Sequence, residues 1–162
     1  MNTPNDWRLL LTAPYAPTPE DSIVVALRLA ALKGGELLVD LGCGDGRVLI
    51  TAVRDFGAKA NGYEIQHKLV EDARRRIQSA GLFSDIQIFE NDFFNEDLSG
   101  ADVVFTYLTP QVGPALASKL GGELRSGSRV VAYRYPIRSW KPETITSDSS
   151  GKGLFLYAMP SS

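Results

Sequence analysis

The chain has 162 residues, of which 44% are hydrophobic and 22% are charged, and its formal net charge is −2 at pH 7. This composition is typical of a globular domain that is large enough to bury a core without disulfides or metals. We therefore expect a single domain over residues 1–162. The small negative charge provides no overall basic surface, which argues against a nucleic-acid partner.

Signals for export, membrane insertion or metal binding are not found in the sequence. No stretch approaches the roughly 20 apolar residues that a membrane span needs, and the first residues lack the basic and apolar regions of a secretory signal. Cys43 is the only cysteine and His67 the only histidine, so neither an internal disulfide nor a histidine-based metal site is expected. We expect a cytoplasmic monomer with no membrane span and no metal.

Residues 1–18 are predicted to form an extended arm, followed by a leading helix over residues 19–34. Three prolines between residues 14 and 19 restrict the backbone of this arm. Thr18 is placed to cap the helix through its hydroxyl group. Tyr15 and Thr18 therefore either pack and cap the helix or contribute to a lid that closes over a ligand.

A strand predicted over residues 37–41 stops in a glycine-rich turn, after which helical periodicity begins over residues 47–56. The strand is almost continuously apolar, which is typical of a central strand covered on both faces. Gly42, Gly44 and Gly46 have no Cβ, so the backbone can take positive φ and let a ligand lie directly on it. The start of the helix adds free N–H groups. We expect a ligand-binding site at this turn.

Two acids restrict which ligand this turn can bind. Asp40 lies near the end of the strand and Asp45 lies within the turn, so a ligand with a cationic part fits better than a bare pyrophosphate. The dinucleotide pattern G-x-G-x-x-G also fails, because its third glycine would fall on Arg47. The run D-L-G-C-G-D-G-R at residues 40–47 resembles the first motif of the class I S-adenosylmethionine (SAM) methyltransferases, whose ligand carries an ammonium, a sulfonium and a carboxylate. A glycine-rich turn in another type of α/β protein is the alternative.

The rest of the chain alternates between strands and helices. This alternation predicts an α/β fold with a Rossmann-like seven-stranded sheet, mostly parallel, with helices on both faces. Residues 140–142 open a hairpin whose return strand covers residues 154–159. Because only a Ser/Gly/Asp-rich turn joins its two strands, they must run antiparallel. The predicted strands cover residues 58–65, 85–89, 101–107, 129–135 and 154–159, and the predicted helices cover residues 66–80 and 114–124.

Candidate nucleoside-binding residues follow the second and third strands. Glu64 lies at about the 20-residue interval at which a βαβ unit places an acid against a ribose, and Ile65 follows it. After the third strand come Asn91, Asp92 and Phe93, where SAM enzymes place a polar residue against the adenine amino group and an apolar residue against its ring. The resemblance therefore implies that these residues bind the cofactor. Core packing is the alternative for Phe93.

Tyr107 ends the fourth predicted strand, at the edge where open α/β sheets bind their ligands. This position places it at the mouth where a methyl group would be transferred. Residues 106–110 and 133–140 contain no acid, which suits a lysine acceptor, because a nearby carboxylate would hold the amine protonated. Tyr107 is our candidate catalytic residue, which would orient the amine. Packing against the cofactor is the alternative role.

Several motifs together resemble one family. The chain is similar to the compact archaeal protein-lysine methyltransferases and to their mitochondrial relatives that methylate the ATP synthase c-subunit. The resemblance covers nearly the whole chain. It rests on P-Y-A-P-T-P-E at 14–20, V-D-L-G-C-G-D-G-R at 39–47, G-Y-E at 62–64, N-D-F-F at 91–94, Y-L-T-P at 107–110 and R-V-V-A-Y-R-Y-P-I-R-S-W-K-P at 129–142.

The resemblance implies an enzyme that binds SAM, releases S-adenosylhomocysteine (SAH) and methylates exposed lysines of protein partners. Tyr15 and Thr18 would join the cofactor site, and Tyr133, Tyr135 and Trp140 would bound the acceptor slot. No insertion is long enough to cap a small metabolite, which indicates an open slot. The alternatives are a SAM-dependent methyltransferase acting on RNA or a small molecule, a non-catalytic SAM-binding module and a dinucleotide-dependent oxidoreductase.

Overall fold

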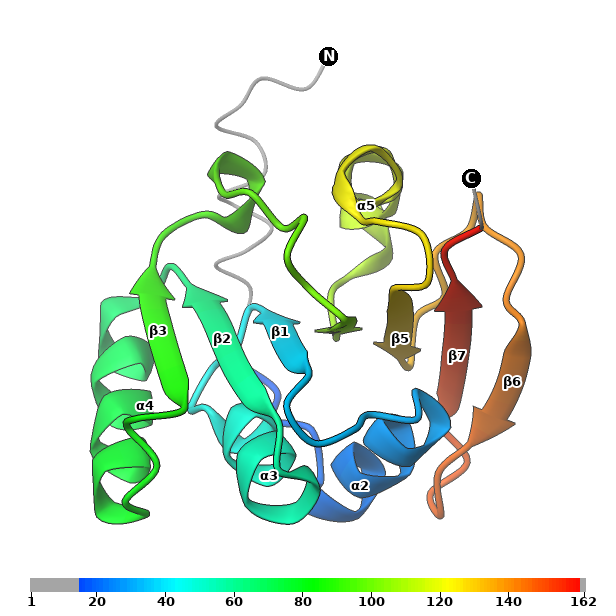
Figure 1. Cartoon of the computed structure of the whole chain (residues 1–162). Coiled ribbons are helices and arrows are strands. Elements are labelled where there is room, and N and C mark those ends of the chain that lie inside the picture. Colours follow the sequence, from blue (N-terminus) through cyan, green and yellow to red (C-terminus); the bar gives the residue numbers. More distant parts are fainter. Residues whose placement is uncertain (1–14, 161–162) are drawn as a thin grey trace.

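The computed structural model describes residues 15–160, which fold around one seven-stranded sheet (Figure 1). The strands are β1 (Leu37–Leu41), β2 (Lys59–Glu64), β3 (Ile86–Glu90), β4 (Val103–Thr106), β5 (Arg129–Tyr133), β6 (Thr144–Ser147) and β7 (Gly153–Ala158). Their order in the sheet is β3-β2-β1-β4-β5-β7-β6. Neighbours from β3 to β5 run parallel, and β7 runs antiparallel to both β5 and β6. The predicted sheet with its antiparallel hairpin is confirmed.

Helices cover both faces of the sheet, as predicted (Figure 1). One face is covered by α2 (Glu20–Leu29), α3 (Arg47–Phe56) and α4 (His67–Ser79). The opposite face is covered by α5 (Gly113–Glu123) and by two short 3₁₀ turns, η1 (Phe93–Asn95) and η2 (Pro110–Val112). The first face is therefore covered by three helices, and the second by one helix together with two short turns.

The side chains of the central strands divide the core into two layers. Val103 and Phe105 of β4 pack in the layer that contains α2 and α3, whereas Val104 packs in the layer that contains α5. All three side chains are buried. Successive side chains of a strand point to opposite faces, so a strand covered on both sides is apolar at every position.

The helix α2 is shorter than the predicted range of residues 19–34, because it ends at Leu29. Ala31 has a positive φ of 52°, and the N–H of Leu32 donates to the carbonyl of Leu27 at 3.1 Å, which closes the helix. Apolar residues continue after Leu29 because they pack as part of the closing turn. Apolar periodicity alone could not distinguish that turn from another turn of helix.

The connection between β3 and β4 contains only the short turn η1, in agreement with the absence of a predicted helix between these strands. Lys119 of α5 holds this connection in place. Its Nζ donates to the carbonyls of Phe94 and Glu96 at 3.3 and 2.6 Å and pairs with Glu123 at 2.7 Å. The other predicted boundaries differ from the observed ones by at most two residues.

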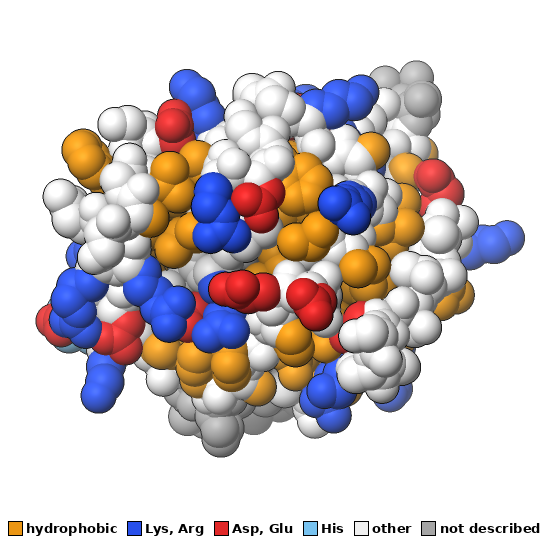
Figure 2. All heavy atoms as spheres, turned by 90° about the horizontal axis from the view of Figure 1, so that it is seen from below, with side chains coloured by type: hydrophobic (Ala, Val, Ile, Leu, Met, Phe, Trp, Pro, Cys, Tyr) orange, Lys and Arg blue, Asp and Glu red, His pale blue; other side chains and the backbone are white. Residues whose placement is uncertain are grey.

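At least one face of the molecule mixes charges of both signs. Figure 2 shows a face on which Lys and Arg side chains lie among Asp and Glu side chains and apolar groups. The arginines at positions 74–76 are exposed on α4. Within residues 15–160, no helix has both the length and the apolar character needed to cross a membrane.

Candidate functional site

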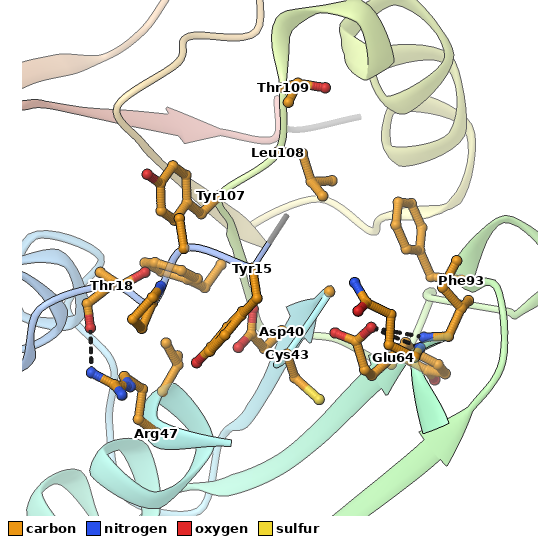
Figure 3. Close-up of a pocket in the computed structure, with 18 of the residues that line it drawn as sticks. Tyr15, Thr18, Asp40, Cys43, Arg47, Glu64, Phe93, Tyr107, Leu108 and Thr109 are labelled. Atoms are coloured by element: carbon orange, nitrogen blue, oxygen red, sulfur yellow. Dashed lines mark hydrogen bonds between the residues drawn. The ribbon is translucent and has the colours of Figure 1, made fainter. Parts of the chain in front are cut away.

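A cavity of about 320 Å³ opens at the carboxyl ends of β1, β2 and β4 (Figure 3). The size is within the usual range for small-molecule sites, about 300–1,000 Å³. Its place follows from the strand order, because open α/β sheets bind ligands outside the carboxyl ends of their strands. The predicted site residues that line the cavity are Tyr15, Thr18, Asp40, Gly42, Glu64, Ile65, Asn91, Phe93, Tyr107 and Tyr135.

The turn between β1 and α3 depends on its three glycines. Gly42, Gly44 and Gly46 have φ values of 78°, 54° and 83°, which residues with a Cβ seldom adopt. A Cβ on Gly44 would lie 2.3 Å from the ring of Tyr15, and one on Gly46 would lie 3.2 Å from Ala73 of α4. Gly42 lines the cavity. The other two glycines shape the turn and let the arm and α4 approach it.

Tyr15 and Thr18 fasten the arm to this turn (Figure 3). The hydroxyl of Tyr15 accepts a hydrogen bond from the N–H of Asp45 at 3.4 Å, and burial raises the pKa of Tyr15 to about 12. Thr18 is held through its carbonyl, which accepts from Nη1 of Arg47 at 3.4 Å. Its hydroxyl does not cap α2, because the capping position is Pro19 and no side chain bonds there. The described end of the arm, residues 15–18, therefore contacts the turn directly, whereas the rest of the predicted arm, residues 1–14, lies outside the described residues.

Asp40 is a buried carboxyl group on the wall of the cavity. Only 3% of the residue is exposed. Burial, reinforced by the charges of Glu64 and Asp45, raises the pKa of Asp40 well above its usual value. In the described part of the chain, no hydrogen bond or cation offsets this cost. A ligand that places a positive charge beside Asp40 would offset it.

Glu64 ties the end of β2 to the glycine turn. Its Oε1 accepts from the N–H of Gly44 at 2.9 Å, and its Oε2 accepts from the N–H groups of Ile65 and Gln66, both at 3.0 Å. These bonds fix the carboxylate at the cavity wall. A carboxylate has about four lone-pair sites, so it can still accept a hydrogen bond from a ligand hydroxyl.

Asn91, Asp92 and Phe93 follow β3, but they do not all face the cavity. Asn91 and Phe93 line it. Asp92 instead caps η1, with its Oδ1 accepting from the N–H of Phe94 at 2.9 Å. The ring of Phe93 packs against that of Phe94, with 4.5 Å between centroids. Asp92 therefore positions the turn that carries Phe93, whereas we predicted that it would contact the ligand.

Tyr107 stands at the carboxyl end of β4, on the other side of the cavity from Phe93 (Figure 3). Its ring meets that of Tyr133 edge to face, with 5.0 Å between centroids, and stacks on that of Tyr135 at 6.2 Å. The hydroxyl of Tyr107 accepts from Nη1 of Arg134 at 3.3 Å. These contacts leave Tyr107 with a defined orientation at the cavity wall.

Tyr133 supports this wall from behind. The residue is 1% exposed, and its hydroxyl donates to Oδ2 of Asp148 at 2.8 Å. The hydroxyl of Ser22 in α2 donates to the same oxygen at 2.8 Å. Hydrogen bonds from Ser150 and then from Ser22 and Tyr133 hold the pKa of Asp148 well below its usual range. Tyr133 is therefore a core residue that packs against Tyr107, whereas we predicted that it would bound the slot.

Two further predicted residues lie outside the cavity. The carboxylate of Asp45 pairs with Nη2 of Arg47 at 2.8 Å. Burial would raise the pKa of Asp45, but hydrogen bonds from Arg47 and Tyr15 outweigh it and lower the pKa. Trp140 packs edge to face on Tyr157, 5.6 Å between centroids, in a separate groove beside α5. Asp45 therefore stabilises the turn, and Trp140 belongs to the α5 layer of the core.

The cavity lining also includes residues that sequence reasoning did not assign to the site, among them Gln66, Leu108 and Arg134. Each of these three closely follows the carboxyl end of a strand. That position was the available signal, but none of the three residue types indicates a particular chemistry by itself. For Arg134 the missing information was the backbone turn that directs it to the cavity.

The side chains that line the cavity match the charges of SAM. The buried carboxylate of Asp40 suits an ammonium group, Glu64 suits the hydroxyls of a ribose and Phe93 offers an apolar surface to a base. Among the described residues, no group of three His, Cys, Asp or Glu side chains could hold a metal ion.

Comparisons with known proteins agree with this chemistry. Residues 40–144 match the family described as the ANTKMT methyltransferase domain. The chain is 38% identical over 150 residues to a protein-lysine N-methyltransferase of Saccharolobus islandicus, covering 90% of this chain and 93% of that protein. It is 31% identical over 144 residues to the adenine nucleotide translocase lysine N-methyltransferase of Mus musculus, covering 89% of this chain. This chain spans only 62% of the mouse protein.

A solved structure shares both fold and sequence. It is described as an RNA methyltransferase from Salinibacter ruber in complex with S-adenosyl-L-homocysteine. The TM-score is 0.87 and the identity 34%, with 91% of this chain and 95% of that chain covered. The names of these similar proteins therefore differ in the acceptor, protein lysine or RNA, and agree on methyl transfer.

Proposed function

The chain belongs to the ANTKMT methyltransferase domain family, and from this premise we propose that it transfers methyl groups from SAM to lysine side chains of other proteins. The observation that carries the proposal is the division of charge across the cavity. Its lining carboxylates, Asp40 and Glu64, belong to β1 and β2. Among the described residues, the side formed by the ends of β4 and β5 offers Tyr107, Arg134 and Tyr135 and no acid.

This division suits two different groups. A cationic cofactor fits beside Asp40 and Glu64, because each carboxylate lowers the free energy of a nearby positive charge or hydroxyl donor. An acceptor lysine fits on the other side, because it must lose its proton before it can attack, and a carboxylate there would retain the proton. The side without acids is therefore assigned to the acceptor.

The cofactor would be held by four residues. Asp40 would pair with its ammonium group, Glu64 would accept from the ribose hydroxyls, Phe93 would lie against the adenine, and Gly42 would let the amino-acid part approach the backbone. When bound, SAM supplies a methyl group that its sulfonium already activates. No covalent bond to the protein is needed, so the protein contributes mainly orientation and the exclusion of competing charges.

Tyr107 would orient the acceptor nitrogen. Its hydroxyl lies at the acid-free side of the cavity, and its ring is held between Tyr133 and Tyr135. A hydroxyl that accepts a hydrogen bond from a neutral amine can direct the nitrogen lone pair without stabilising the ammonium form as strongly as a carboxylate would.

RNA is the second candidate acceptor, and one observation favours it. The solved structure at 34% identity is described as an RNA methyltransferase. The net charge of −2 favours a protein acceptor instead, because binding to a phosphate backbone usually requires a basic surface.

Product analysis distinguishes these acceptors. Purified protein is incubated with methyl-labelled SAM and a cell extract, and the labelled species are identified by mass spectrometry. We expect the label in acid-stable methyl-lysine. Label in nucleotides after nuclease digestion would establish RNA as the acceptor, and label in the low-mass fraction would establish a small molecule. Asp40→Asn is the control and should give no label above background.

Three further proposals concern the whole protein. We propose one methyltransferase domain over residues 1–162, because the sheet spans most of the chain. We propose that it acts as a monomer, since one chain already supplies both the carboxylates and the aromatic wall of the cavity. The free thiol of the buried Cys43 supports a reducing, cytoplasmic compartment. Size-exclusion chromatography with light scattering tests the second of these proposals.

A further inference from the structure

Arg134 has an unusual backbone at the edge of the cavity. Its φ is 70°, and among the described residues it shares a positive φ without being glycine only with Ala31. The N–H of Tyr135 donates to the carbonyl of Tyr133 at 2.8 Å, which closes a three-residue turn centred on Arg134. Such γ-turns are rare and strained when the central φ is positive. The N–H of Arg134 also donates to the carbonyl of Gly153 at 2.7 Å, which holds the turn against β7.

A glycine would adopt this turn without strain, whereas an arginine adopts it at a cost. The reason for an arginine at this position must therefore lie in its side chain. Residues held in unfavourable backbone conformations carry a free-energy cost and cluster at functional sites. Here the turn directs a cationic side chain to the cavity wall, beside Tyr107. The strain therefore points to a role for the guanidinium group.

The guanidinium group is oriented, but it has no negative partner among the residues that the structure describes. Its Nη1 donates to the hydroxyl of Tyr107 at 3.3 Å, and its central carbon lies 5.3 Å from the ring centroid of Tyr135. Within residues 15–160, it forms no ion pair with a carboxylate. The five donors of an arginine form a planar fork that matches a carboxylate. With respect to the described residues, most of this fork is free to bind one.

The strand order places this free cation on the acceptor side. Asp40 and Glu64 mark the ends of β1 and β2, whereas Arg134 follows β5, which is separated from β1 by β4. Neighbouring strands are about 4.8 Å apart, so two strand spacings separate β5 from the cofactor turn. The segment 134–141 adds two more exposed cations, Arg138 and Lys141, and contains no acid.

We propose that Arg134 binds a carboxylate of the protein acceptor, so that the enzyme prefers lysines that lie beside an acidic residue. The inference rests on the proposed lysine methyltransferase function and adds the substrate class to it. The pairing would also serve the chemistry. An acidic neighbour stabilises the ammonium form of a lysine, and a guanidinium that neutralises this neighbour removes that effect.

The test compares the sites that variants methylate in one cell extract. Methyl-lysines formed by the wild type, Arg134→Gln and Arg134→Glu are mapped by mass spectrometry, and the frequency of Asp and Glu within four positions is counted. We expect acidic enrichment for the wild type. The enrichment should fall about three- to tenfold in Arg134→Gln, the range for a single partly exposed charge pair. Arg134→Glu should shift the preference toward Lys and Arg neighbours.

Arg138→Gln is the matched control, since it removes an exposed cation from the same segment without touching the cavity lining. It should keep the acidic enrichment. Arg134→Lys should keep part of it, because the charge stays and the planar fork is lost. Thermal melting of each variant verifies folding.

Calorimetry tests whether Arg134 binds the carboxylate of the acceptor or the carboxylate of the cofactor. SAH carries a carboxylate, whereas 5′-methylthioadenosine lacks the amino-acid part. Equal affinities of wild type and Arg134→Gln for both probes are expected. A loss of affinity for SAH alone would assign Arg134 to the cofactor and overturn the inference. Methyl-lysines without acidic enrichment would also overturn it, and would leave the proposed function intact. Unmodified lysines in every sample would reject both.

Discussion

Asp40 shows how one buried residue connects stability with ligand binding. Its carboxyl group is removed from water without a compensating partner, and the neighbouring charges of Glu64 and Asp45 add to the cost. A raised pKa in the folded state means that the native protein holds this proton more tightly than the unfolded chain does. Stability therefore falls as the pH rises from the unfolded value of about 3.9 toward the raised native value.

Asp40→Asn should separate the two effects. The amide carries no charge, so at pH 7 the unliganded variant should melt at a higher temperature than the wild type, while its affinity for SAH should fall steeply. Asp85→Asn, which changes an exposed acid in the turn before β3, should alter neither property. Differential scanning calorimetry and isothermal titration measure both. A variant that melts lower and still binds SAH would show that Asp40 is structural.

The role of the Tyr107 hydroxyl can be tested by kinetics with a single substitution. Tyr107→Phe removes the hydroxyl and keeps the ring that packs on Tyr133 and Tyr135. If the hydroxyl orients the amine, the single-turnover rate should fall about tenfold, as expected for one hydrogen bond made in the reaction step. SAM affinity should be nearly unchanged. A variant with weakened SAM binding and a normal rate at saturating SAM would assign Tyr107 to cofactor packing instead.

At the scale of elements, the arm and the glycine turn act as one unit. Tyr15 lies so close to Gly44 that a Cβ there would be 2.3 Å from the ring. Thr18 and Asp45 connect the same two segments through Arg47. The arm therefore closes on the turn only because position 44 has no side chain.

Gly44→Ala should displace the arm and weaken SAH binding at least about tenfold, since the variant also carries the cost of roughly 1–2 kcal/mol for a left-handed alanine. In the double variant with Tyr15→Ala, the steric part of this loss should vanish, so the two effects should not add. Gly122→Ala is the control, because its added Cβ meets nothing within 4 Å. Strict additivity in titration calorimetry would show that arm and turn act independently.

The sequence could predict this element-scale arrangement only in part. The bounds of β1 and α3 follow from an apolar run, a glycine turn and helical periodicity, which are local properties. Asp45 and Trp140 were assigned to the site on motif position, but side-chain direction depends on partners that are distant in sequence. Asp45 turns to Arg47 and Trp140 to Tyr157. The strained turn at Arg134 has no local sequence pattern.

At the scale of the whole molecule, charge distribution decides how salt affects activity. The face shown in Figure 2 carries both signs intermixed, and the proposed acceptor contact involves a single guanidinium group. With protein acceptors, kcat/KM should therefore fall with a log–log slope of about one or less as salt increases. An RNA acceptor that touches several phosphates would give a slope of about 0.7 for each phosphate. Steady-state rates between about 50 and 200 mM salt measure this slope.

The topology also sets an order of assembly during synthesis. β7 follows every other described strand in the chain, yet it lies between β5 and β6 in the sheet. The strands that carry Asp40 and Glu64 find all their neighbours among β1 to β4, whereas β5 keeps one edge unpaired until residues 153–158 leave the ribosome. Tyr133 and the turn of Arg134 gain their β7 contacts only then. The strands of the cofactor side can therefore find their pairing partners earlier in synthesis than those of the acceptor side.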